Sequence, residues 1–190
     1  LAPIVAHNVD MPALRTPKVK SPPTENQLWE YALRVISARA LSAGEMRTRL
    51  RRRGAEAGII DTVMAKLREY GYLDDSAFAG AYASARKDNQ GHGRERVLRD
   101  LRARQVAPGL AETAVAATYA ETDEVALIEA YIARKLRREN LATYLADPAH
   151  LASAFRRLRY AGFSASNSIR VLRRFSEQAE ELDSSEADPQ

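Results

Sequence analysis

The sequence predicts an all-α protein built from three tandem three-helix repeats. A pattern of five positions recurs three times along the 190-residue chain: a leucine in a helix, two residues at a turn and two positions in the next helix. We call these positions the skeleton. Each copy has an Arg-rich amphipathic segment, a short turn and a second apolar segment, and no stretch alternates like a β-strand. Repeats of this length are typical of helical arrays, which usually present a long binding surface rather than an enzyme pocket. The skeleton positions are Leu50, Gly54, Ala55, Val63 and Leu67; Leu101, Gln105, Val106, Ala114 and Thr118; and Leu158, Gly162, Phe163, Val171 and Phe175.

The chain begins with a Pro-rich arm, after which the first repeat is expected at residues 28–73. Residues 1–27 hold five of the eight prolines and show no helical period, so we expect a disordered arm. Thr24 and Gln27 have the spacing of a capping box, in which each side chain accepts a backbone N–H of the other residue. This box predicts the start of the first helix.

Two further helices complete the first repeat. Ser42 and Glu45 form a second capping box, which opens a helix that stops at Gly54. The third helix is expected from about residue 57 to residue 70. Gly71 follows it and is expected to end it in the left-handed conformation that glycine adopts without strain.

The second repeat is expected at residues 74–121. Asp74 and Asp75 precede an apolar helix, and either carboxylate can accept the free N–H groups of its first turn. The run Gly91–Gly93 breaks the chain before the Arg-rich middle helix. Pro108 is suited to the first turn of the last helix, because proline lacks only an N–H that has no partner there.

The third repeat is expected at residues 122–176 and departs from the first two. Its first helix is longer, and the connection over residues 139–147 has no pattern that assigns it to a helix. Asp147 and Pro148 predict the start of its middle helix, and Gly162 the end. Together the three repeats give nine expected helices and no strand.

The predicted repeats form a basic body. The chain carries a net charge of +4, but residues 28–176 hold 26 Lys and Arg against 17 Asp and Glu, a net of +9. Residues 177–190 hold six acids and no Lys or Arg, and we expect them to form an acidic, disordered tail. A basic body is typical of proteins that bind nucleic acid or an acidic protein surface.

Composition also limits where the protein acts. No apolar run approaches the ~20 residues that a membrane-spanning helix needs, and the N-terminus lacks the order of a signal peptide. The chain has no cysteine, which excludes disulfides and thiolate metal sites and suits a reducing compartment. We therefore expect a cytoplasmic protein without a membrane anchor.

No constellation in the sequence predicts catalysis, a metal or another cofactor. His7, His92 and His150 have no partner at metal-ligand spacing. Asp74 and Asp75 are better explained as helix caps than as paired acid–base catalysts. The Gly91–Gly93 turn, followed by Arg94 and Arg96, leaves open a weak anion cradle at a helix start. A plain turn is the simpler interpretation.

The arginines are the positive indication of function, because they crowd the same middle helix in each repeat. Arginine is suited to binding, since its planar fork engages carboxylates and phosphates through two hydrogen bonds. Part of the pattern has a simpler cause, because cations near a helix C-terminus complement its dipole. The predicted basic surface consists of Arg47, Arg49, Arg51, Arg52, Arg53, Arg86, Arg94, Arg96, Arg99, Arg102, Arg104, Arg156, Arg157 and Arg159.

One stretch of the sequence resembles the signature of the RecX family of bacterial recombination regulators. It begins with Ser42-Ala43-Gly44-Glu45-Met46, Leu50 and Gly54 and continues through Glu69-Tyr70-Gly71-Tyr72-Leu73-Asp74-Asp75. The resemblance covers about residues 28–176 and weakens in the third repeat. Its remaining motif positions are Phe78, Ala79, Arg86 and Gly93.

The resemblance implies a fold and a partner. Members of the family are elongated, curved arrays of three-helix repeats that bind the RecA filament, restrain its ATPase and strand-exchange activities, and are not enzymes. It implies a monomer here, with weak binding to single-stranded DNA, and a structural role for Gly71, Leu73, Asp74, Asp75, Phe78, Ala79 and Gly93. Gln105 stands where a glycine is common in the family, so we expect its turn to adopt a different conformation.

The alternative is a transcriptional regulator that reads a DNA sequence with helix-turn-helix-like units. Against it, the Arg-rich helix is the middle one of each repeat, and its charges favour non-specific anion contacts. Four aromatic residues, Trp29, Tyr72, Tyr82 and Tyr160, are expected to pack in the core or between repeats rather than to stack on bases.

Overall fold

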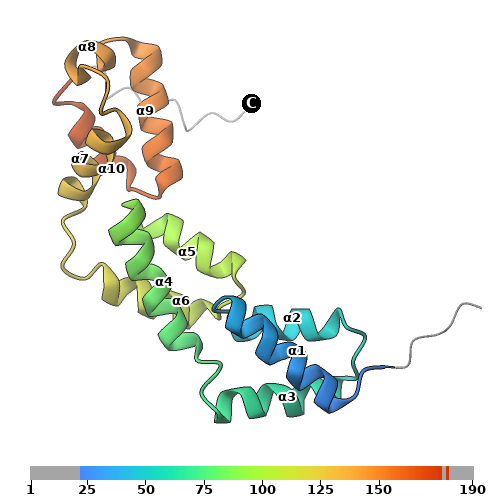
Figure 1. Ribbon diagram of the computed structural model, residues 1–190. Coiled ribbons are helices and arrows are strands. Elements are labelled where there is room, and N and C mark those ends of the chain that lie inside the picture. The colour runs from blue at the N-terminus through green and yellow to red at the C-terminus, as the bar shows by residue number, and fades with distance from the viewer. Residues whose placement is uncertain (1–21, 177–178, 180–190) are drawn as a thin grey trace, which may run out of the picture.

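The computed structural model describes residues 22–176 and residue 179 (Figure 1). Within this part every regular element is a helix, which confirms the all-α prediction, and none of these helices has the length and apolar character to cross a membrane. The helices are α1 Glu25–Ala38, α2 Ala43–Arg51, α3 Ala57–Glu69, α4 Asp75–Gln90, α5 Arg94–Ala103, α6 Pro108–Thr118, α7 Glu124–Lys135, α8 Leu141–Leu145, α9 Pro148–Ala161 and α10 Ala165–Leu172.

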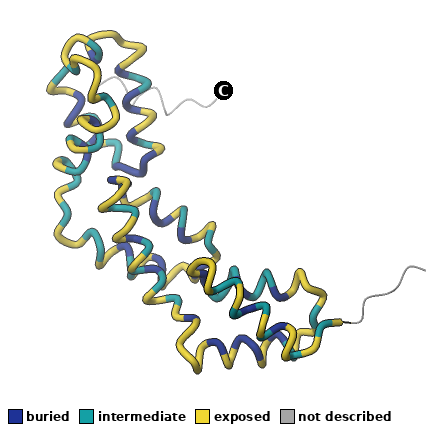
Figure 2. The backbone as a smooth tube through the Cα atoms, in the orientation of Figure 1, coloured by how far each residue is buried: buried dark blue, intermediate teal, exposed yellow. Residues whose placement is uncertain are grey.

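The helices form three groups that follow one another in an elongated, bent row (Figure 1). α1–α3, α4–α6 and α7–α10 each enclose a separate hydrophobic core. Leu50, Leu101 and Leu158, at the first position of the recurring skeleton, are each at most 1% exposed in these cores. Figure 2 shows that the buried stripes of the helices face inward within each group. Each repeat therefore has a core of its own, and contacts between the ends of helices join one repeat to the next.

The predicted caps shape the helix starts. Both capping boxes are present, with Gln27 N–H donating to the Thr24 hydroxyl at the start of α1 and Glu45 N–H donating to the Ser42 hydroxyl at the start of α2. Asp74 alone caps α4, where one carboxylate oxygen accepts the N–H groups of the first turn at 2.9 Å. The carboxylate of the neighbouring Asp75 does not cap α4 and instead contacts the first repeat.

The prediction of nine helices was wrong, because the described residues contain ten. The additional helix is α8, which lies in the unassigned connection of the third repeat. Asn140 caps it by accepting the N–H of Thr143 at 3.3 Å, and Leu145 is buried in the third core. A five-residue helix is too short to show a helical period, so tertiary packing rather than the sequence pattern defines it.

The ends of the chain differ partly from the prediction. Residues 25–27, which were placed in the arm, form the first turn of α1. Residues 1–21 of the arm and the tail, apart from Ala179, lie outside the described residues.

Candidate partner-binding surface

The middle helices of the three repeats meet end to end. The C-terminal turn of α9 contacts the N-terminus of α5, and the C-terminal turn of α5 contacts the N-terminus of α2. We call α2, α5 and α9, with the turns that end them, the middle-helix row; its course can be followed through the molecule in Figure 1. Of the arginines in the predicted basic surface, only Arg86 lies outside this row. The row therefore sets how the basic residues are presented.

The junction between the second and third repeats is made by backbone groups. The Gly93 N–H donates to the Ala161 carbonyl at 2.8 Å, and the Glu95 N–H donates to the Gly162 carbonyl at 3.1 Å. A Cβ added to Gly93 would lie only 2.3 Å from the Gly162 oxygen. Protein carbonyls therefore accept the Gly93 and Glu95 N–H groups, which removes both of them from the anion cradle that the sequence left open at Gly91–Gly93.

His92 lies beside this junction and is half-buried. Its carbonyl accepts the Tyr119 hydroxyl at 2.6 Å, and its Nδ1 has no hydrogen-bond partner among the described residues. Burial lowers the pKa of His92, and the positive charge of Arg96 lowers it further. His92 is thus held in its neutral form near neutral pH.

Side chains make the junction between the first and second repeats. The Ser42 hydroxyl donates to the Arg104 carbonyl, so the residue that caps α2 also joins it to the end of α5. The Arg104 guanidinium donates to the Ala40 carbonyl at 3.0 Å and forms an ion pair with Glu45 at 2.8 Å. Arg104 therefore contacts the N-terminus of α2 with both its backbone and its side chain.

Asp75 links the same two repeats. Its carboxylate accepts the Ala43 N–H of α2 at 2.7 Å, across 32 residues of chain. The adjacent Asp74 caps its own helix. In the aspartate pair of the motif, Asp74 therefore caps a helix and Asp75 joins two repeats.

Gln105 corrects one expectation drawn from the sequence. Its φ is +58°, so it adopts the same left-handed conformation as Gly54 and Gly162, whose φ values are +74° and +92°. Junction contacts offset the strain of a side chain there, since the Thr48 hydroxyl donates to the Gln105 side chain at 2.8 Å. Gly44 allows this approach, because a Cβ at Gly44 would lie 2.4 Å from the Gln105 carbonyl oxygen.

Several predicted surface arginines hold the junctions or turns rather than facing solvent freely. Arg99 donates to the Tyr160 carbonyl at 2.9 Å, and the Arg96 guanidinium lies 4.5 Å from the centre of the Tyr160 ring. The contact with Tyr160 raises the pKa of Arg96, so it stays charged. Arg159 donates to the Phe163 carbonyl at 2.6 Å within the third repeat. Together with Arg104, these residues connect helices.

Four other arginines contact side chains of their own repeat. Three of these contacts hold the guanidinium against a neighbouring helix and the contact of Arg86 lies along its own helix, and the exposed ion pairs among them contribute little to stability. They are Arg47 with Asp61 at 2.6 Å, Arg102 with Glu112 at 3.5 Å, Arg86 with Gln90 at 2.6 Å, and Arg53 over the ring of Tyr31 at 4.0 Å.

The remaining arginines of the predicted surface are available to a partner. Within residues 22–176 they form no hydrogen bond or ion pair, and all but Arg49, which is partly buried, are exposed. They occur in all three repeats along the middle-helix row. We call them the open arginines: Arg49, Arg51, Arg52, Arg94, Arg156 and Arg157.

The remaining residues of the motif occupy structural positions. Gly71 has a φ of +71° at the end of α3, and Leu73 is 5% exposed in the first core. Phe78 and Ala79 pack in the core of the second repeat, and Gly93 forms the junction described above. Leu73, Phe78, Ala79 and Gly93 are thus packed within the fold, whereas Gly71 is exposed at its turn.

Two of the four aromatic residues that were expected to pack in the core or between repeats are largely exposed, although Tyr160 does contact Arg96 of the second repeat. Tyr72 is 48% exposed and Tyr160 is 71% exposed, because both lie at helix ends where a neighbour covers only one side of the ring. Trp29 lies between Tyr70 and Tyr72, with ring centres 5.7 and 6.2 Å apart. Tyr82 is partly buried and stacks on a neighbouring ring, as expected.

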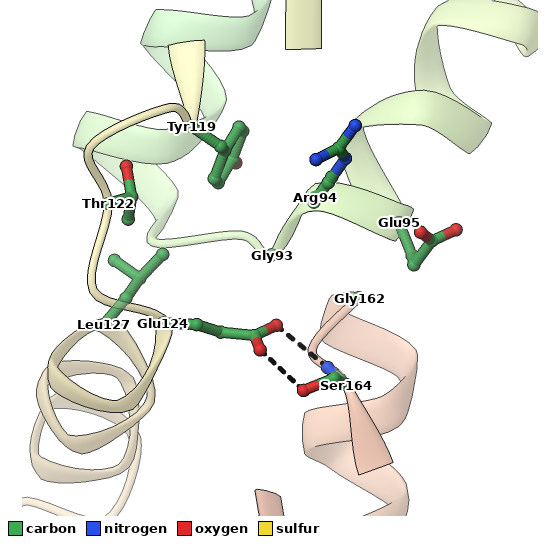
Figure 3. Close-up of a pocket in the computed structure, with 9 residues that line it drawn as sticks. All are labelled: Gly93, Arg94, Glu95, Tyr119, Thr122, Glu124, Leu127, Gly162 and Ser164. Carbon is green, nitrogen blue, oxygen red and sulfur yellow. Dashed lines mark hydrogen bonds between the residues drawn. The ribbon is translucent and has the colours of Figure 1, made fainter. Parts of the chain in front are cut away.

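A cavity of about 280 Å³ lies between the second and third repeats (Figure 3). Figure 3 shows the Glu124 carboxylate directed at Ser164, whose N–H and hydroxyl both donate to it, the N–H at 2.9 Å. Burial opposes ionisation, but hydrogen bonds from Ser164 and Asn167 outweigh it and hold the pKa of Glu124 below its ordinary value. Glu124 thus joins α7 to the start of α10.

In residues 22–176 and 179, no group of three or more His, Asp and Glu side chains is placed to hold a metal ion. The carboxylate in the cavity is already used by hydrogen bonds within the fold. The open arginines thus lie along helices that the junction contacts join to one another.

Comparison with known proteins identifies the family. Residues 29–67 match a model of the first three-helix domain of RecX, and residues 74–115 match a model of its second three-helix domain. Regulatory protein RecX of Mycobacterium ulcerans is 30% identical over 125 residues, which cover 66% of this chain and 72% of that protein. The chain belongs to the RecX family. Regulatory protein RecX of Treponema pallidum is 33% identical over 107 residues, 56% of this chain and 65% of that protein.

Solved RecX structures share the fold. The crystal structure of RecX from Lactobacillus salivarius superposes with a TM-score of 0.60 at 19% identity, over 84% of this chain and 96% of that one. The two RecX domain matches fall on α1–α3 and on α4–α6. The third repeat, with the additional helix α8, lies beyond both matched segments.

Proposed function

We propose that this RecX-family protein is a non-catalytic regulator that binds the RecA nucleoprotein filament and inhibits its ATPase and strand-exchange activities. The observation that carries the proposal is the middle-helix row, which presents open arginines in each of three successive repeats. A filament repeats one surface at regular intervals. An array that repeats one basic element is suited to such a partner.

The contacts expected in the filament groove follow from the chemistry of arginine. Each open arginine offers a planar fork of donors to the carboxylates of a protein surface or to the phosphates of bound DNA. The junction contacts of Arg96, Arg99 and Arg104 hold successive middle helices in a fixed relation, so that several arginines engage at once without being ordered separately.

Inhibition would then follow from occupancy rather than from a reaction. A long protein lying in the groove hinders filament growth, nucleotide turnover and the entry of a second DNA. We further propose that the protein works in the cytoplasm as a monomer and that its own binding to single-stranded DNA is weak. No catalytic residue or cofactor enters this scheme.

The proposal is tested by titrating the protein into RecA assembled on single-stranded DNA. ATP hydrolysis and strand exchange should both fall as the protein approaches saturation of the filament. Repeating the binding at several salt concentrations separates the contacts, because neutralising Z phosphates of single-stranded DNA gives a log–log slope of about −0.7Z. Absence of both binding and inhibition at several-fold excess would exclude the proposal. A footprint on one defined duplex without RecA would instead favour a transcriptional regulator.

A further inference from the structure

The same turn makes both junctions of the array. Arg104 and Gln105, after α5, rest on the N-terminus of α2, and Ala161 and Gly162, at the end of α9, rest on the N-terminus of α5. In each case the second residue has a positive φ, and the carbonyl of the first accepts a hydrogen bond from the helix start that it contacts. The turn is therefore a binding element for a helix N-terminus.

The first repeat has this turn too, at Arg53 and Gly54 after α2. Gly54 has a φ of +74°, and its N–H donates to the Arg51 carbonyl at 2.9 Å, as Gln105 N–H donates to Arg102. Among the described residues, however, no helix start rests on it. A Cβ added to Gly54 would meet no atom within 4 Å, and no donor from that part of the chain reaches the Arg53 or Gly54 carbonyl. We call Arg53 and Gly54 the open turn.

The first junction shows which helix start fits such a turn. There the N-cap hydroxyl of Ser42 donates to the Arg104 carbonyl, and Glu45, three residues later, pairs with the Arg104 guanidinium. Gly44 between them leaves room for the turn residue. The helix start thus offers an N-cap hydroxyl, a small residue and then a carboxylate.

The open turn has the complementary groups in place. Arg53 corresponds to Arg104, and its guanidinium lies 4.0 Å from the centre of the Tyr31 ring, as that of Arg104 lies over the ring of Tyr82. Arg53 has no carboxylate partner among the described residues, whereas Arg104 has Glu45. A cavity of about 290 Å³ adjoins Arg53 and Tyr31. The Arg53 guanidinium and the carbonyls of Arg53 and Gly54 are therefore available to a ligand.

A second copy of this chain is not a suitable occupant through the corresponding helix start. That start is the N-terminus of α9, where the Asp147 carboxylate already accepts the N–H groups of Ala149 and His150. Pro148 at its first position also lacks an N–H. A second copy of this chain therefore does not extend the row through this helix start, and we take the occupant of the open turn to be a helix of another protein.

We propose that the open turn binds the N-terminus of a helix in a partner protein, one that begins with a Ser or Thr N-cap, a small residue two positions later and a Glu three positions later. The hydroxyl donates to the Arg53 carbonyl, and the carboxylate pairs with the Arg53 guanidinium above Tyr31. This turn directly follows Arg51 and Arg52 of the filament contact proposed above, but its occupant is a separate helix start and does not depend on the identity of that partner.

The probe is an Ala-rich helical peptide that begins Leu-Ser-Ala-Gly-Glu, added to the ¹⁵N-labelled full-length chain. Amide shifts should concentrate at Arg51–Gly54 and Tyr31. A matched peptide that begins Leu-Ala-Ala-Gly-Gln should bind about tenfold more weakly, as expected from losing roughly 1.4 kcal/mol. Arg53→Glu should abolish the shifts, whereas Arg138→Glu, an equal charge change at an exposed distant site, should leave them unchanged.

Three outcomes would overturn the proposal. They are an absence of shifts at millimolar peptide, equal binding of the two peptides, and unchanged binding by Arg53→Glu in a chain whose circular dichroism shows intact helices. Tighter peptide binding after deletion of residues 1–21 would also overturn it, by making the arm the natural occupant. None of these results bears on inhibition of RecA, so failure here is distinguishable from failure of the proposed function.

Discussion

Gly93 lies so close to the carbonyl of Gly162 that it has no room for a side chain, and Gly162 in turn has none beside Arg96. A Cβ on Gly93 would lie 2.3 Å from the Gly162 carbonyl oxygen, and a Cβ on Gly162 would lie 2.1 Å from the Arg96 nitrogen. In both cases the nearest obstructing atom belongs to the backbone, which does not move aside as the end of a flexible side chain would. A side chain at either position would therefore force the junction between the second and third repeats to shift.

Gly93→Ala should separate these repeats. Its φ of −76° suits alanine, so the cost comes from overpacking alone, which is typically about 1–3 kcal/mol. Hydrogen exchange at Gly93 and Glu95 should accelerate, and the midpoint of urea unfolding should fall. The matched control is Gly109→Ala in α6, where a Cβ meets nothing within 4 Å and the gain in helix propensity is about 0.5–1 kcal/mol. Equal effects of the two substitutions would contradict this account.

Arg104→Ala should weaken the first junction. The change removes the hydrogen bond to Ala40 and the ion pair with Glu45, whose side chain is only 14% exposed. Losing a charged hydrogen bond at such a site costs about 1.5–3 kcal/mol of unfolding free energy, measured by chemical denaturation. Arg102→Ala is the control, because its pair with Glu112 is exposed and worth at most about 1 kcal/mol. A loss no larger than that of the control would exclude a junction role for Arg104.

Replacing Arg49, Arg51 and Arg52 with alanine should weaken binding to the RecA filament while leaving the fold intact. Exposed ion pairs contribute up to about 1 kcal/mol each, so losing three should raise the Kd by about tenfold or more. The measurement is fluorescence anisotropy of the labelled protein on the filament. Arg137 and Arg138, exposed but outside the middle-helix row, provide the matched double-alanine control. Unchanged affinity of the triple variant would place the contact elsewhere.

Stability should fall with acid as His92 takes up a proton. Its pKa is lowered in the folded protein by burial and by Arg96, so below the ordinary value of about 6.5 the unfolded chain binds more protons than the folded one. Unfolding free energy is therefore fully retained above that pH and decreases as the pH falls toward the depressed pKa. Thermal unfolding of the wild type between about pH 8 and pH 5 should show this loss, and His92→Gln should reduce it. Identical pH profiles would show that His92 is not responsible.

Local sequence signals were sufficient for most of the fold. The capping boxes at Thr24 and Ser42 and the left-handed glycine at Gly71 depend on residues within one helical turn, so their patterns predict them. Gln105 escaped prediction because its left-handed conformation is stabilised by Thr48 and Gly44 of another repeat. The information that fixes it is distant in the sequence.

The same distinction applies to the binding surface. Arg94, Arg96 and Arg99 look alike in the sequence, yet only Arg94 is an open arginine. Arg96 and Arg99 both contact Tyr160 of the third repeat, which lies 61 residues after Arg99 in the chain. Substituting all three together would combine the loss of a binding residue with damage to a junction. Composition predicts that the surface is basic, but only the packing of one repeat on the next shows which charges remain available.

The middle-helix row has two different ends, the N-terminus of α9 and the open turn after α2, so the molecule has a direction. Passing from α9 through α5 to α2, each helix is entered at its N-terminus and left at its C-terminus, so the row begins at Asp147 and finishes at Gly54. Its two ends differ in charge and in the backbone groups that they expose. A filament grown from identical subunits also has a head and a tail. A molecule of this build lying along it therefore has two inequivalent orientations and should adopt one of them, which would give the regulator a sense of direction along the DNA.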